Sequence, residues 1–461
     1  MTHTFHPSIL RAYDIRGVIG ETLSQRDAYF IGRAFATRVK QEEGRVVCVG
    51  RDGRLSSPEL MQSVIQGLSE GGLDVICVGL GPTPLTYFAM HHLKADAALM
   101  VTGSHNPANY NGFKMCLSKG PMFGRDIEEL GQIAEAGDLS EGSGKTTDRD
   151  LAAIYLEYLL KDFSTHYPNA KSLKIAWDAG NGAAGELLED LAKELPGEHI
   201  LLNTTIDGTF PAHHPDPVVL ENLVQLQQAV AEGGCDLGIA FDGDGDRIGV
   251  IDGQGRMIFG DLLVTLFAGE VLKTHPSAPI IVDVKASQVF FEEVKRLGGE
   301  PIMWRTGHSI IKSKMKQIDC PLAGEMSGHM FFADRYFGFD DALYAAMRLI
   351  GIVSSQEETI AQWRDRLPQR ISTPEMNIAC DDVKKFQIIE EITEKLKAQP
   401  DIALNDIDGV RVTTKAGWWL LRASNTQSAL VARIEADTQE NVEKLRQELA
   451  AHLAAYGLKA T

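Results

Sequence analysis

A serine stands in a sharp turn after a run of apolar residues, where its hydroxyl is free to do chemistry. The run Ala97 to Val101 predicts a buried strand, and Ser104 follows it in the segment Thr102 to Pro107. Gly103 frees the backbone before the hydroxyl, and Asn106-Pro107 prevents a regular element from continuing. Turn serines often do no more than bond their own backbone, so Ser104 alone does not establish a nucleophile.

A second motif places carboxylates at alternate positions in one tight loop. Asp242, Asp244 and Asp246 are separated by glycines and lie between the apolar runs 237–240 and 248–251. Their oxygens can converge on one divalent cation, since glycine permits the turn. An EF-hand is excluded, because the positions for its glycine and glutamate hold Arg247 and Gly253. A solvated acidic turn is the alternative, but carboxylates this close repel one another unless a cation or Arg247 compensates.

Two further polar segments follow predicted strands. The guanidinium, hydroxyl and amide donors of 422–427 suit a phosphate monoester, although a polar hairpin turn fits the same residues. Glu325 and Ser327 alternate to one side and could bond adjacent sugar hydroxyls, with His329 able to give or take a proton. Other polar or cationic side chains stand beside strand ends or turns, each alone typical of a surface: Tyr13, Arg16, Lys114, Lys285 and His308.

One glycine-rich segment suggests a different class of enzyme. Residues 180–185 fit G-x-G-x-x-G, follow a predicted strand and open a helix. Asp207 follows at a sequence spacing that suits the acidic residue that binds the ribose of a dinucleotide. Asp178, however, would face the pyrophosphate of a dinucleotide with a like charge. We therefore interpret these glycines as close helix-to-strand packing and disfavour a dehydrogenase.

The elements that must position these residues repeat along the chain. Strand-like runs at 46–49, 173–177 and 280–284 each lead into a turn and then a helical pattern, which predicts one α/β plan used three times. Residues 56–59 predict a capping box for the first of these helices. Beyond residue 384 the order changes to helix, strand-like runs and a closing helix capped by Asp437, which predicts a separate α+β module.

Composition excludes several classes of protein. The chain has 461 residues and a formal charge of −18, which disfavours non-specific binding to nucleic acid or to an anionic membrane. Its six dispersed cysteines suggest neither a disulfide framework nor a zinc site, and a reducing cytoplasm fits best. The first residues lack the pattern of a signal peptide, and no apolar run is long enough to span a membrane.

Taken in chain order, the motifs resemble those of the α-D-phosphohexomutase superfamily, and within it the bacterial phosphomannomutase/phosphoglucomutase group. The resemblance covers nearly the whole chain, through the segments 11–17, 102–107, 242–247, 324–329 and 422–426. It implies an α/β protein with three similar mixed-sheet α/β domains and a C-terminal α+β, TATA-binding-protein-like domain around a central cleft. The expected domains are 1–153, 154–254, 255–367 and 368–461.

The resemblance also implies roles for individual residues. Ser104 would carry the phosphoryl group as phosphoserine, and an oxygen of that group would bind Mg²⁺ together with Asp242, Asp244 and Asp246. Arg247 would stabilise the same group. Acid/base and supporting roles would fall to Lys114, His329, His105 and Asn106. Substrate contacts would come from Tyr13, Arg16, Lys285, His308, Glu325, Ser327, His329, Arg422, Ser424, Asn425 and Thr426.

The implied reaction moves phosphate within a hexose. Ser104 would phosphorylate the free 1- or 6-hydroxyl of a hexose phosphate, giving a hexose 1,6-bisphosphate that also serves as activator. The bisphosphate would turn end for end and return its other phosphate to Ser104. We expect a cytoplasmic protein, a monomer or weak homo-oligomer, whose partners are small-molecule hexose phosphates and neither nucleic acid nor membrane.

Three alternatives remain open at this stage. A Mg-dependent sugar phosphatase could use the same phosphoserine, and a non-catalytic protein could bind a divalent cation in the same acidic loop. A phosphoglucosamine mutase is disfavoured by Met326, because that group typically carries glutamine at this position, so mannose and glucose phosphates are preferred. Gln427-Ser428 departs from the proline-containing continuation of the group, which affects the expected loop backbone.

Overall fold

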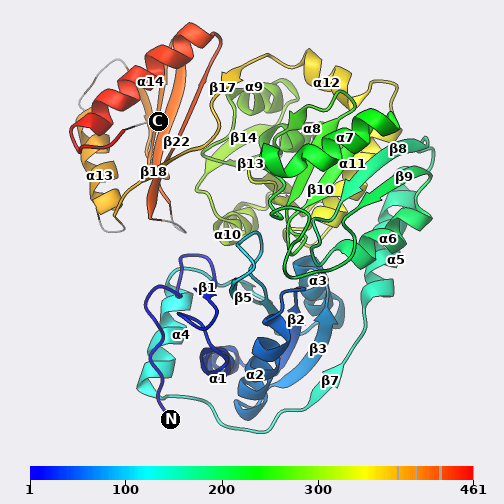
Figure 1. Ribbon diagram of the computed structural model, residues 1–461, viewed down its shortest axis with the longest axis vertical. Helices are drawn as coiled ribbons and strands as arrows, with labels where there is room; N and C mark the ends of the chain where they lie inside the picture. Colours follow the sequence, from blue (N-terminus) through cyan, green and yellow to red (C-terminus); the bar gives the residue numbers. More distant parts are fainter. Residues whose placement is uncertain (382–383, 398, 400–401, 425–427, 460–461) are drawn as a thin grey trace.

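The chain folds into four successive units, each built on its own β-sheet (Figure 1). The computed structural model describes residues 1–381, 384–397, 399, 402–424 and 428–459, and these form the four sheets. The first unit lies at the bottom of the view, the second and third at the upper right, and the fourth, with the C-terminus, at the upper left (Figure 1). We call these units the first to fourth domains.

The first domain has a mixed sheet in the order β1-β5-β4-β2-β3-β7, with β6 beside β5. Strands β4, β2, β3 and the edge strand β7 run parallel, whereas β5 runs antiparallel to both β4 and β1. The elements are β1 (Ile15–Val18), α1 (Gln25–Gln41), β2 (Val46–Arg51), α2 (Ser57–Glu70), β3 (Asp74–Leu80), α3 (Thr83–Leu93), β4 (Ala97–Val101), β5 (Tyr110–Leu117), β6 (Gly120–Pro121), α4 (Arg125–Ala136) and β7 (Thr146–Asp148).

The second domain repeats this plan in the order β12-β11-β10-β8-β9. β10, β8 and β9 are parallel, and β11 turns back antiparallel to β10. The elements are α5 (Ala152–His166), β8 (Leu173–Asp178), α6 (Gly185–Glu194), β9 (Gly197–Leu202), the short 3₁₀ helix η1 (Leu220–Leu223), α7 (Val224–Gly233), β10 (Leu237–Phe241), β11 (Ile248–Asp252) and β12 (Met257–Ile258).

The third domain has the order β14-β13-β15-β16, again with parallel strands followed by one antiparallel strand, β16. The three α/β repeats predicted from the sequence are thus confirmed. The elements are α8 (Gly260–Thr274), β13 (Pro279–Asp283), α9 (Gln288–Arg296), β14 (Glu300–Trp304), α10 (His308–Ile318), β15 (Leu322–Gly324), β16 (Met330–Phe332), α11 (Ala342–Ser354) and α12 (Ile360–Arg366).

The fourth domain differs in having an antiparallel sheet, ordered β17-β22-β21-β20-β19 with β18 on β22. Helix α14 lies along the sheet with Val442, Leu445, Leu449 and Leu453 buried, as its sequence pattern predicted (Figure 1). The elements are β17 (Ile371–Ser372), β18 (Met376–Ala379), α13 (Lys384–Lys397), β19 (Ala403–Asn405), β20 (Val410–Thr414), β21 (Gly417–Ala423), β22 (Ala429–Ala436) and α14 (Gln439–Ala454).

Two predicted helix caps are wrong in detail. Ser56 precedes α2 but makes no side-chain cap hydrogen bond, and the Ser57 hydroxyl instead donates to Asp52 Oδ1 at 2.5 Å. Helix α14 is capped by Thr438, whose hydroxyl accepts from the Asn441 amide, and not by Asp437. At α2 the Ser56 hydroxyl accepts from Asn111 Nδ2 at 2.8 Å instead of capping the helix, and at α14 the adjacent Thr438 takes the cap position.

The apolar cores join the domains as well as filling them. The largest core runs from α3 of the first domain through α5 and α6 to α8 and α11 of the third, and includes Phe88, Tyr155, Leu188, Phe267 and Leu349. In the part of the chain that the structure describes, the cysteines form no disulfide. No helix among the described residues is long and apolar enough to cross a lipid bilayer.

One buried carboxylate holds α5 against α11. Asp341 caps α11 by accepting from the Tyr344 amide, and both of its oxygens accept from the Tyr155 hydroxyl at 2.9 Å. The Tyr336 hydroxyl also donates to it at 2.7 Å. Burial raises the pKa of Asp341 to about 6, so these donors are what make its charged form tolerable.

We expect Tyr155→Phe to destabilise the protein by about 1–3 kcal/mol, because it leaves a buried carboxylate short of a donor. Differential scanning calorimetry of the variant at pH 8 measures this as a lower melting temperature. Tyr29→Phe is the matched control, since the Tyr29 hydroxyl bonds the exposed Glu70. Equal effects of the two changes would contradict the role assigned to Tyr155.

Candidate active site

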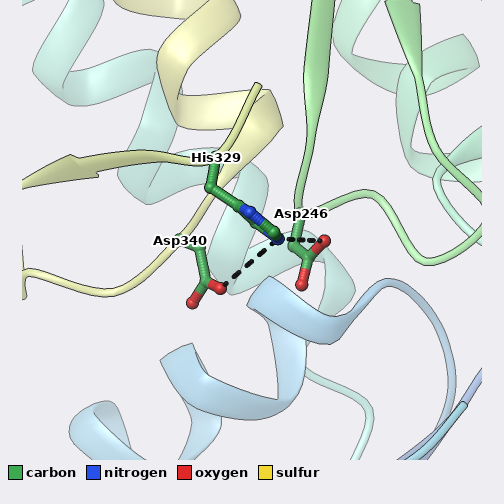
Figure 2. Close-up of side chains that lie close together, drawn as sticks. All are labelled: Asp246, His329 and Asp340. Carbon is green, nitrogen blue, oxygen red and sulfur yellow. Dashed lines mark ion pairs between the residues drawn. The ribbon is translucent and has the colours of Figure 1, made fainter. Parts of the chain in front are cut away.

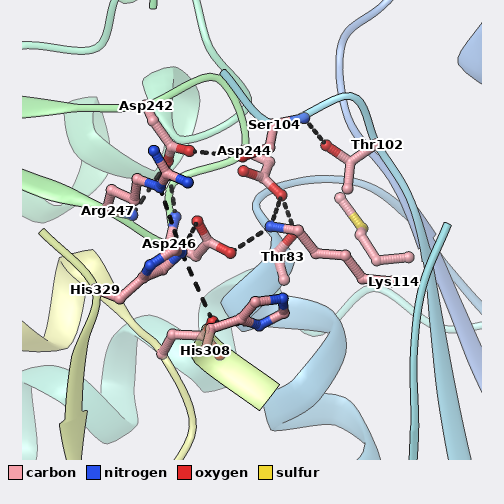
Figure 3. A network of polar contacts seen from close by, with 12 residues as sticks. Thr83, Thr102, Ser104, Lys114, Asp242, Asp244, Asp246, Arg247, His308 and His329 are labelled. Atoms are coloured by element: carbon pink, nitrogen blue, oxygen red, sulfur yellow. Dashed lines mark hydrogen bonds and ion pairs between the residues drawn. The ribbon is translucent and has the colours of Figure 1, made fainter. Parts of the chain in front are cut away.

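Ser104 sits at the end of β4 in a strained, buried loop. Its φ is 49°, its exposed fraction is 1%, and its hydroxyl donates to Asp242 Oδ2 at 3.0 Å (Figure 3). The Thr102 hydroxyl accepts from the Ser104 amide at 2.8 Å. A left-handed backbone at a non-glycine residue is kept only where surrounding contacts enforce it, so the loop is built to present this hydroxyl.

Arg54 enforces that loop, and its role was not predicted from the sequence. Its guanidinium is 1% exposed and donates to the carbonyls of Ser104, Asn106, Pro107 and Tyr110 at 2.5–3.0 Å. Asp52 pairs with Arg54 at 3.2 Å and accepts from the Gly103 amide at 3.1 Å. The only sequence signal was an arginine shortly after the strand now seen as β2.

The three aspartates of the predicted cation loop lie between β10 and β11, and all are fully buried. One oxygen from each lies within 4.8 Å of the others. Asp242 Oδ1 accepts from the amides of Asp246 and Arg247 at 3.1 Å, which fixes the loop backbone. Burial, followed by the charges of Asp244 and Asp246, raises the pKa of Asp242 well above its ordinary value.

The first domain supplies a cation and a hydroxyl to these carboxylates. Lys114, on β5, donates to Asp244 Oδ2 at 2.7 Å and to Asp246 Oδ2 (Figure 3). Burial acts to lower the pKa of Lys114, but the two carboxylates outweigh it and raise this pKa above its ordinary value. Thr83, at the start of α3, donates to Asp244 Oδ2 at 2.5 Å. Thr83 was not among the predicted site residues.

The carboxylate oxygens of the aspartate loop fit a hard divalent cation. Asp244 Oδ1 and Asp246 Oδ1 are buried and have no hydrogen-bond partner among the described residues. Buried oxygens left without donors are costly, and carboxylate oxygens are the ligands that Mg²⁺ prefers. Asp242 Oδ2 faces the Ser104 hydroxyl, so an ion held by the loop would lie beside Ser104.

His329 links the third domain to the aspartate loop. Its Nδ1 lies 2.8 Å from Glu325 Oε2, and its Nε2 lies 3.3 Å from Asp246 Oδ1 and 4.0 Å from Asp340 Oδ2 (Figure 2). Burial acts to lower the pKa of His329, but the neighbouring carboxylates, Asp246 first, raise it to about 9. An imidazole with such a pKa carries a proton near neutral pH and has the chemistry of a proton donor.

Two further predicted site residues, Arg247 and His105, lie beside the aspartate loop and Ser104, respectively. Arg247 Nε contacts His329 Nε2 at 3.3 Å, and the two backbones form an antiparallel bridge between the second and third domains. His105 Nδ1 lies 3.3 Å from Ser104 Oγ. Burial and the charge of Arg247 lower the pKa of His105 well below its ordinary value, which favours a neutral imidazole.

The predicted sugar-binding residues of the third domain also meet. Glu325 Oε1 accepts from the Gly307 amide at 2.7 Å, and Ser327 Oγ lies 3.3 Å from His329 Nδ1. His308 stacks on His329 with ring centres 5.5 Å apart, and its Nδ1 lies 3.1 Å from Asp340 Oδ2. Asp340, which the sequence analysis did not single out, is therefore a shared neighbour of both imidazoles.

Three more predicted residues, Arg16, Tyr13 and Arg422, contact other segments of the chain rather than the aspartate loop. Arg16 donates to the Gly103 carbonyl at 2.5 Å and to Asn106 Oδ1 at 2.8 Å, close to Ser104. The Tyr13 hydroxyl donates to the Thr306 carbonyl at 2.7 Å. Asp408, also not predicted, accepts from the Thr306 amide and from Arg422 Nε, both at 3.0 Å.

The last predicted residues lie in the fourth domain or at its contact with the third domain. Lys285 pairs with Glu375 at 2.8 Å, which ties the third domain to the start of the fourth. Ser424 is buried, and its amide donates to the Ala429 carbonyl at 2.9 Å. Asn425 and Thr426 lie outside the described residues, as does Gln427. The contacts at Asp408 and Glu375 thus connect the fourth domain to the third.

Comparison with known proteins identifies the family. Models of phosphoglucomutase/phosphomannomutase α/β/α domains I, II and III match residues 7–140, 153–255 and 259–371, and the C-terminal domain model matches 375–452. The chain belongs to the phosphoglucomutase/phosphomannomutase family. It is therefore an enzyme of the sugar-phosphate mutase class, and the resemblance drawn from its motifs is confirmed.

Individual relatives of this family enzyme align along nearly its whole length. It is 46% identical over 439 residues to a phosphomannomutase/phosphoglucomutase of Pseudomonas syringae pv. tomato, covering 95% of this chain and 93% of that protein. It is 43% identical to a phosphoglucomutase of Neisseria gonorrhoeae, covering 95% of each. The crystal structure of a phosphoglucomutase/phosphomannomutase family protein from Burkholderia thailandensis superposes with a TM-score of 0.90 at 41% identity, covering 98% of each chain.

We expect Arg54→Lys to loosen the Ser104 loop, because a lysine cannot bond four carbonyls at once. Losing two of these bonds, at about 1 kcal/mol each, should speed amide hydrogen exchange of residues 104–110 by about tenfold or more. Exchange measured by mass spectrometry, with Arg51→Lys as the control at a half-buried neighbouring arginine, checks this. Unchanged exchange in Arg54→Lys would mean that other contacts hold the loop.

Proposed function

We propose that this enzyme interconverts hexose 1-phosphates and hexose 6-phosphates, of mannose, glucose or both, through a phosphoserine at Ser104. One observation carries the proposal: the Ser104 hydroxyl lies in hydrogen-bond contact with the carboxylate loop, at 3.0 Å from Asp242 Oδ2. A phosphoryl group on this oxygen would stand beside the oxygens that suit a divalent cation. The names of the relatives supply the substrate class.

The proposed transfer has two mirrored halves. In the first, the P–O bond to Ser104 breaks and a new P–O bond forms to the free sugar hydroxyl, whose proton passes to a base. The product is a bound hexose 1,6-bisphosphate, which reorients so that its other phosphate faces Ser104. In the second half that phosphate returns to Ser104, the sugar oxygen takes up a proton, and the isomer is released.

Charge at the transferring group would be balanced by side chains from the first two domains. Asp242, Asp244 and Asp246 would hold Mg²⁺, which when bound neutralises the phosphoryl oxygens and stabilises the departing serine oxygen. Arg247 is placed to pair with the same group from the second domain, since its amide is fixed on Asp242 Oδ1. Lys114 lies on the opposite side, on Asp244 and Asp246.

Proton transfer would use groups that lie beside Ser104 or beside the aspartate loop. His329, with its pKa raised to about 9, suits the role of acid, and Lys114 is the other acid/base candidate. His105, whose pKa is lowered, suits the role of a neutral acceptor beside the hydroxyl. Asn106 supports this arrangement by accepting from Arg16.

Recognition of the sugar and of the unreactive phosphate would fall to the third and fourth domains. Glu325 and Ser327 would bond sugar hydroxyls, and Arg422, Ser424, Asn425 and Thr426 would bind the phosphate. Tyr13, Arg16, Lys285 and His308 complete the proposed substrate contacts. We propose that the domains divide after residues 153, 254 and 367, and the order of the four family models along the chain supports this division.

Further parts of the proposal rest on composition. The net charge of −18 and the dispersed cysteines support a cytoplasmic enzyme that acts on small molecules, without nucleic acid or membrane partners. We also propose that it is a monomer or weak homo-oligomer. Hexose 1,6-bisphosphate would act as activator, because it phosphorylates Ser104 in any enzyme molecule that has lost its phosphate.

We expect Ser104→Ala to lower mutase activity by at least about a thousandfold, since the phosphoryl carrier is removed. Intact-mass measurement should show one phosphate on the wild type after incubation with bisphosphate and none on the variant. Ser118→Ala, at an exposed serine, is the control and should keep both phosphate and activity. An active Ser104→Ala enzyme would overturn the proposed mechanism.

Met326 leads us to expect a preference for mannose and glucose phosphates over glucosamine phosphate. Met326 is 7% exposed, and its sulfur contacts the Arg433 guanidinium at 2.7 Å. We expect kcat/KM for mannose 1-phosphate and glucose 1-phosphate to exceed that for glucosamine 1-phosphate by tenfold or more, measured with Mg²⁺ and a trace of bisphosphate. Comparable values would favour a phosphoglucosamine mutase, and free phosphate as the main product would favour a sugar phosphatase.

A further inference from the structure

A second cluster of metal-binding atoms lies beside the aspartate loop, between the second and third domains. Asp246, His329 and Asp340 each present one ligand atom within 4.8 Å of the others, and all three side chains are buried (Figure 2). Unlike the aspartate loop, this cluster contains an imidazole nitrogen. Nitrogen and carboxylate donors together suit Zn²⁺ and similar transition ions better than Mg²⁺.

One of the separations in the cluster equals that of a tetrahedral site. Ligands at about 2.0–2.1 Å from Zn²⁺ lie roughly 3.3 Å from one another, and His329 Nε2 is 3.3 Å from Asp246 Oδ1. Asp340 Oδ2 lies 4.0 Å from the same nitrogen, so a small closing movement of this carboxylate completes the set. A fourth position is left for water or a substrate oxygen.

Each ligand is already oriented through its other polar atom. Glu325 Oε2 holds His329 Nδ1 at 2.8 Å, Lys312 donates to Asp340 Oδ1 at 2.7 Å, and Lys114 donates to Asp246 Oδ2. A carboxylate on the distal nitrogen of a histidine is the common outer shell of a zinc ligand. The supports fix the three side chains without using the atoms that would bind the ion.

Two of those atoms are completely buried and are met by imidazole ion pairs rather than by well-formed hydrogen bonds. Asp246 Oδ1 and Asp340 Oδ2 have no hydrogen-bond partner among the described residues, and their neighbours are imidazole nitrogens and Arg247. Arg247 Nε contacts His329 Nε2 at 3.3 Å and would turn aside when an ion binds. Buried carboxylate oxygens left in this state gain most from a cation.

We infer that Asp246, His329 and Asp340 form a second divalent-cation site, selective for Zn²⁺ or a similar transition ion. Asp246 belongs to both cation sites, so zinc binding does not by itself distinguish them. Asp340 and His329 belong only to the second site, and they provide the test.

Zinc binding to the full-length enzyme is measured by equilibrium dialysis with millimolar Mg²⁺ present, which occupies the aspartate loop. We expect one zinc ion per wild-type chain, and affinity at least about tenfold weaker in Asp340→Asn and in His329→Gln. Asp252→Asn is the control, because this buried carboxylate bonds Gln254 and Arg256 and should leave zinc affinity unchanged. Equal affinity in wild type and Asp340→Asn overturns the proposal.

Zinc K-edge absorption spectroscopy provides a readout that does not depend on mutase activity. The wild-type spectrum should show one imidazole among oxygen ligands, and His329→Gln should lose the imidazole signal. An all-oxygen zinc environment in the wild type would place the ion in the aspartate loop instead and overturn the proposal. Because these readouts measure binding, they stand or fall separately from the proposed phosphoserine mechanism.

Discussion

The burial of the carboxylates of one loop is the constraint on which the rest of the structure depends. Asp242, Asp244 and Asp246 are removed from water within a few ångströms of one another, and such a cluster is unstable without nearby cations and donors. Lys114 and Thr83 come from the first domain, and His329 comes from the third. The charges of the second domain can therefore be satisfied only when all three domains are in contact.

The three α/β domains present their functional loops at the same place in the fold. In each, a buried parallel strand leads through the loop into an antiparallel strand: β4 to β5, β10 to β11 and β15 to β16. In the first and third domains the neighbouring strand also ends near an aspartate that can accept from the loop. Asp52 accepts from the Gly103 amide, and Asp283 lies 3.4 Å from the Met326 amide. In these two domains the repeat therefore supplies both the loop and its support.

Motifs whose residues are adjacent in the chain could be predicted from the sequence. Side chains that hold such a motif from a distant part of the chain could not. The aspartate loop and the Ser104 turn were recognisable because their residues are adjacent in the chain. Arg54, Asp340 and Asp408 were missed, since each acts on a segment far from it in sequence: Arg54 on residues 104–110, Asp340 on His308 and Asp408 on Thr306. Among the glycines of 180–185, Gly185 at the start of α6 lies against the backbone of Thr204 just beyond β9, which supports the packing interpretation at that position.

The sequence by itself determined the elements, the three α/β repeats, the α+β C-terminal module and the identity of the chemical groups, because strand periodicity, turn residues and short motifs are local properties. The tertiary structure alone decided how those groups are charged and held. Lys114 reaches two carboxylates more than 120 positions away in the chain, and His329 takes its raised pKa from Asp246 in another domain. Burial and distance set these properties, and neither can be assigned until the domains are packed together.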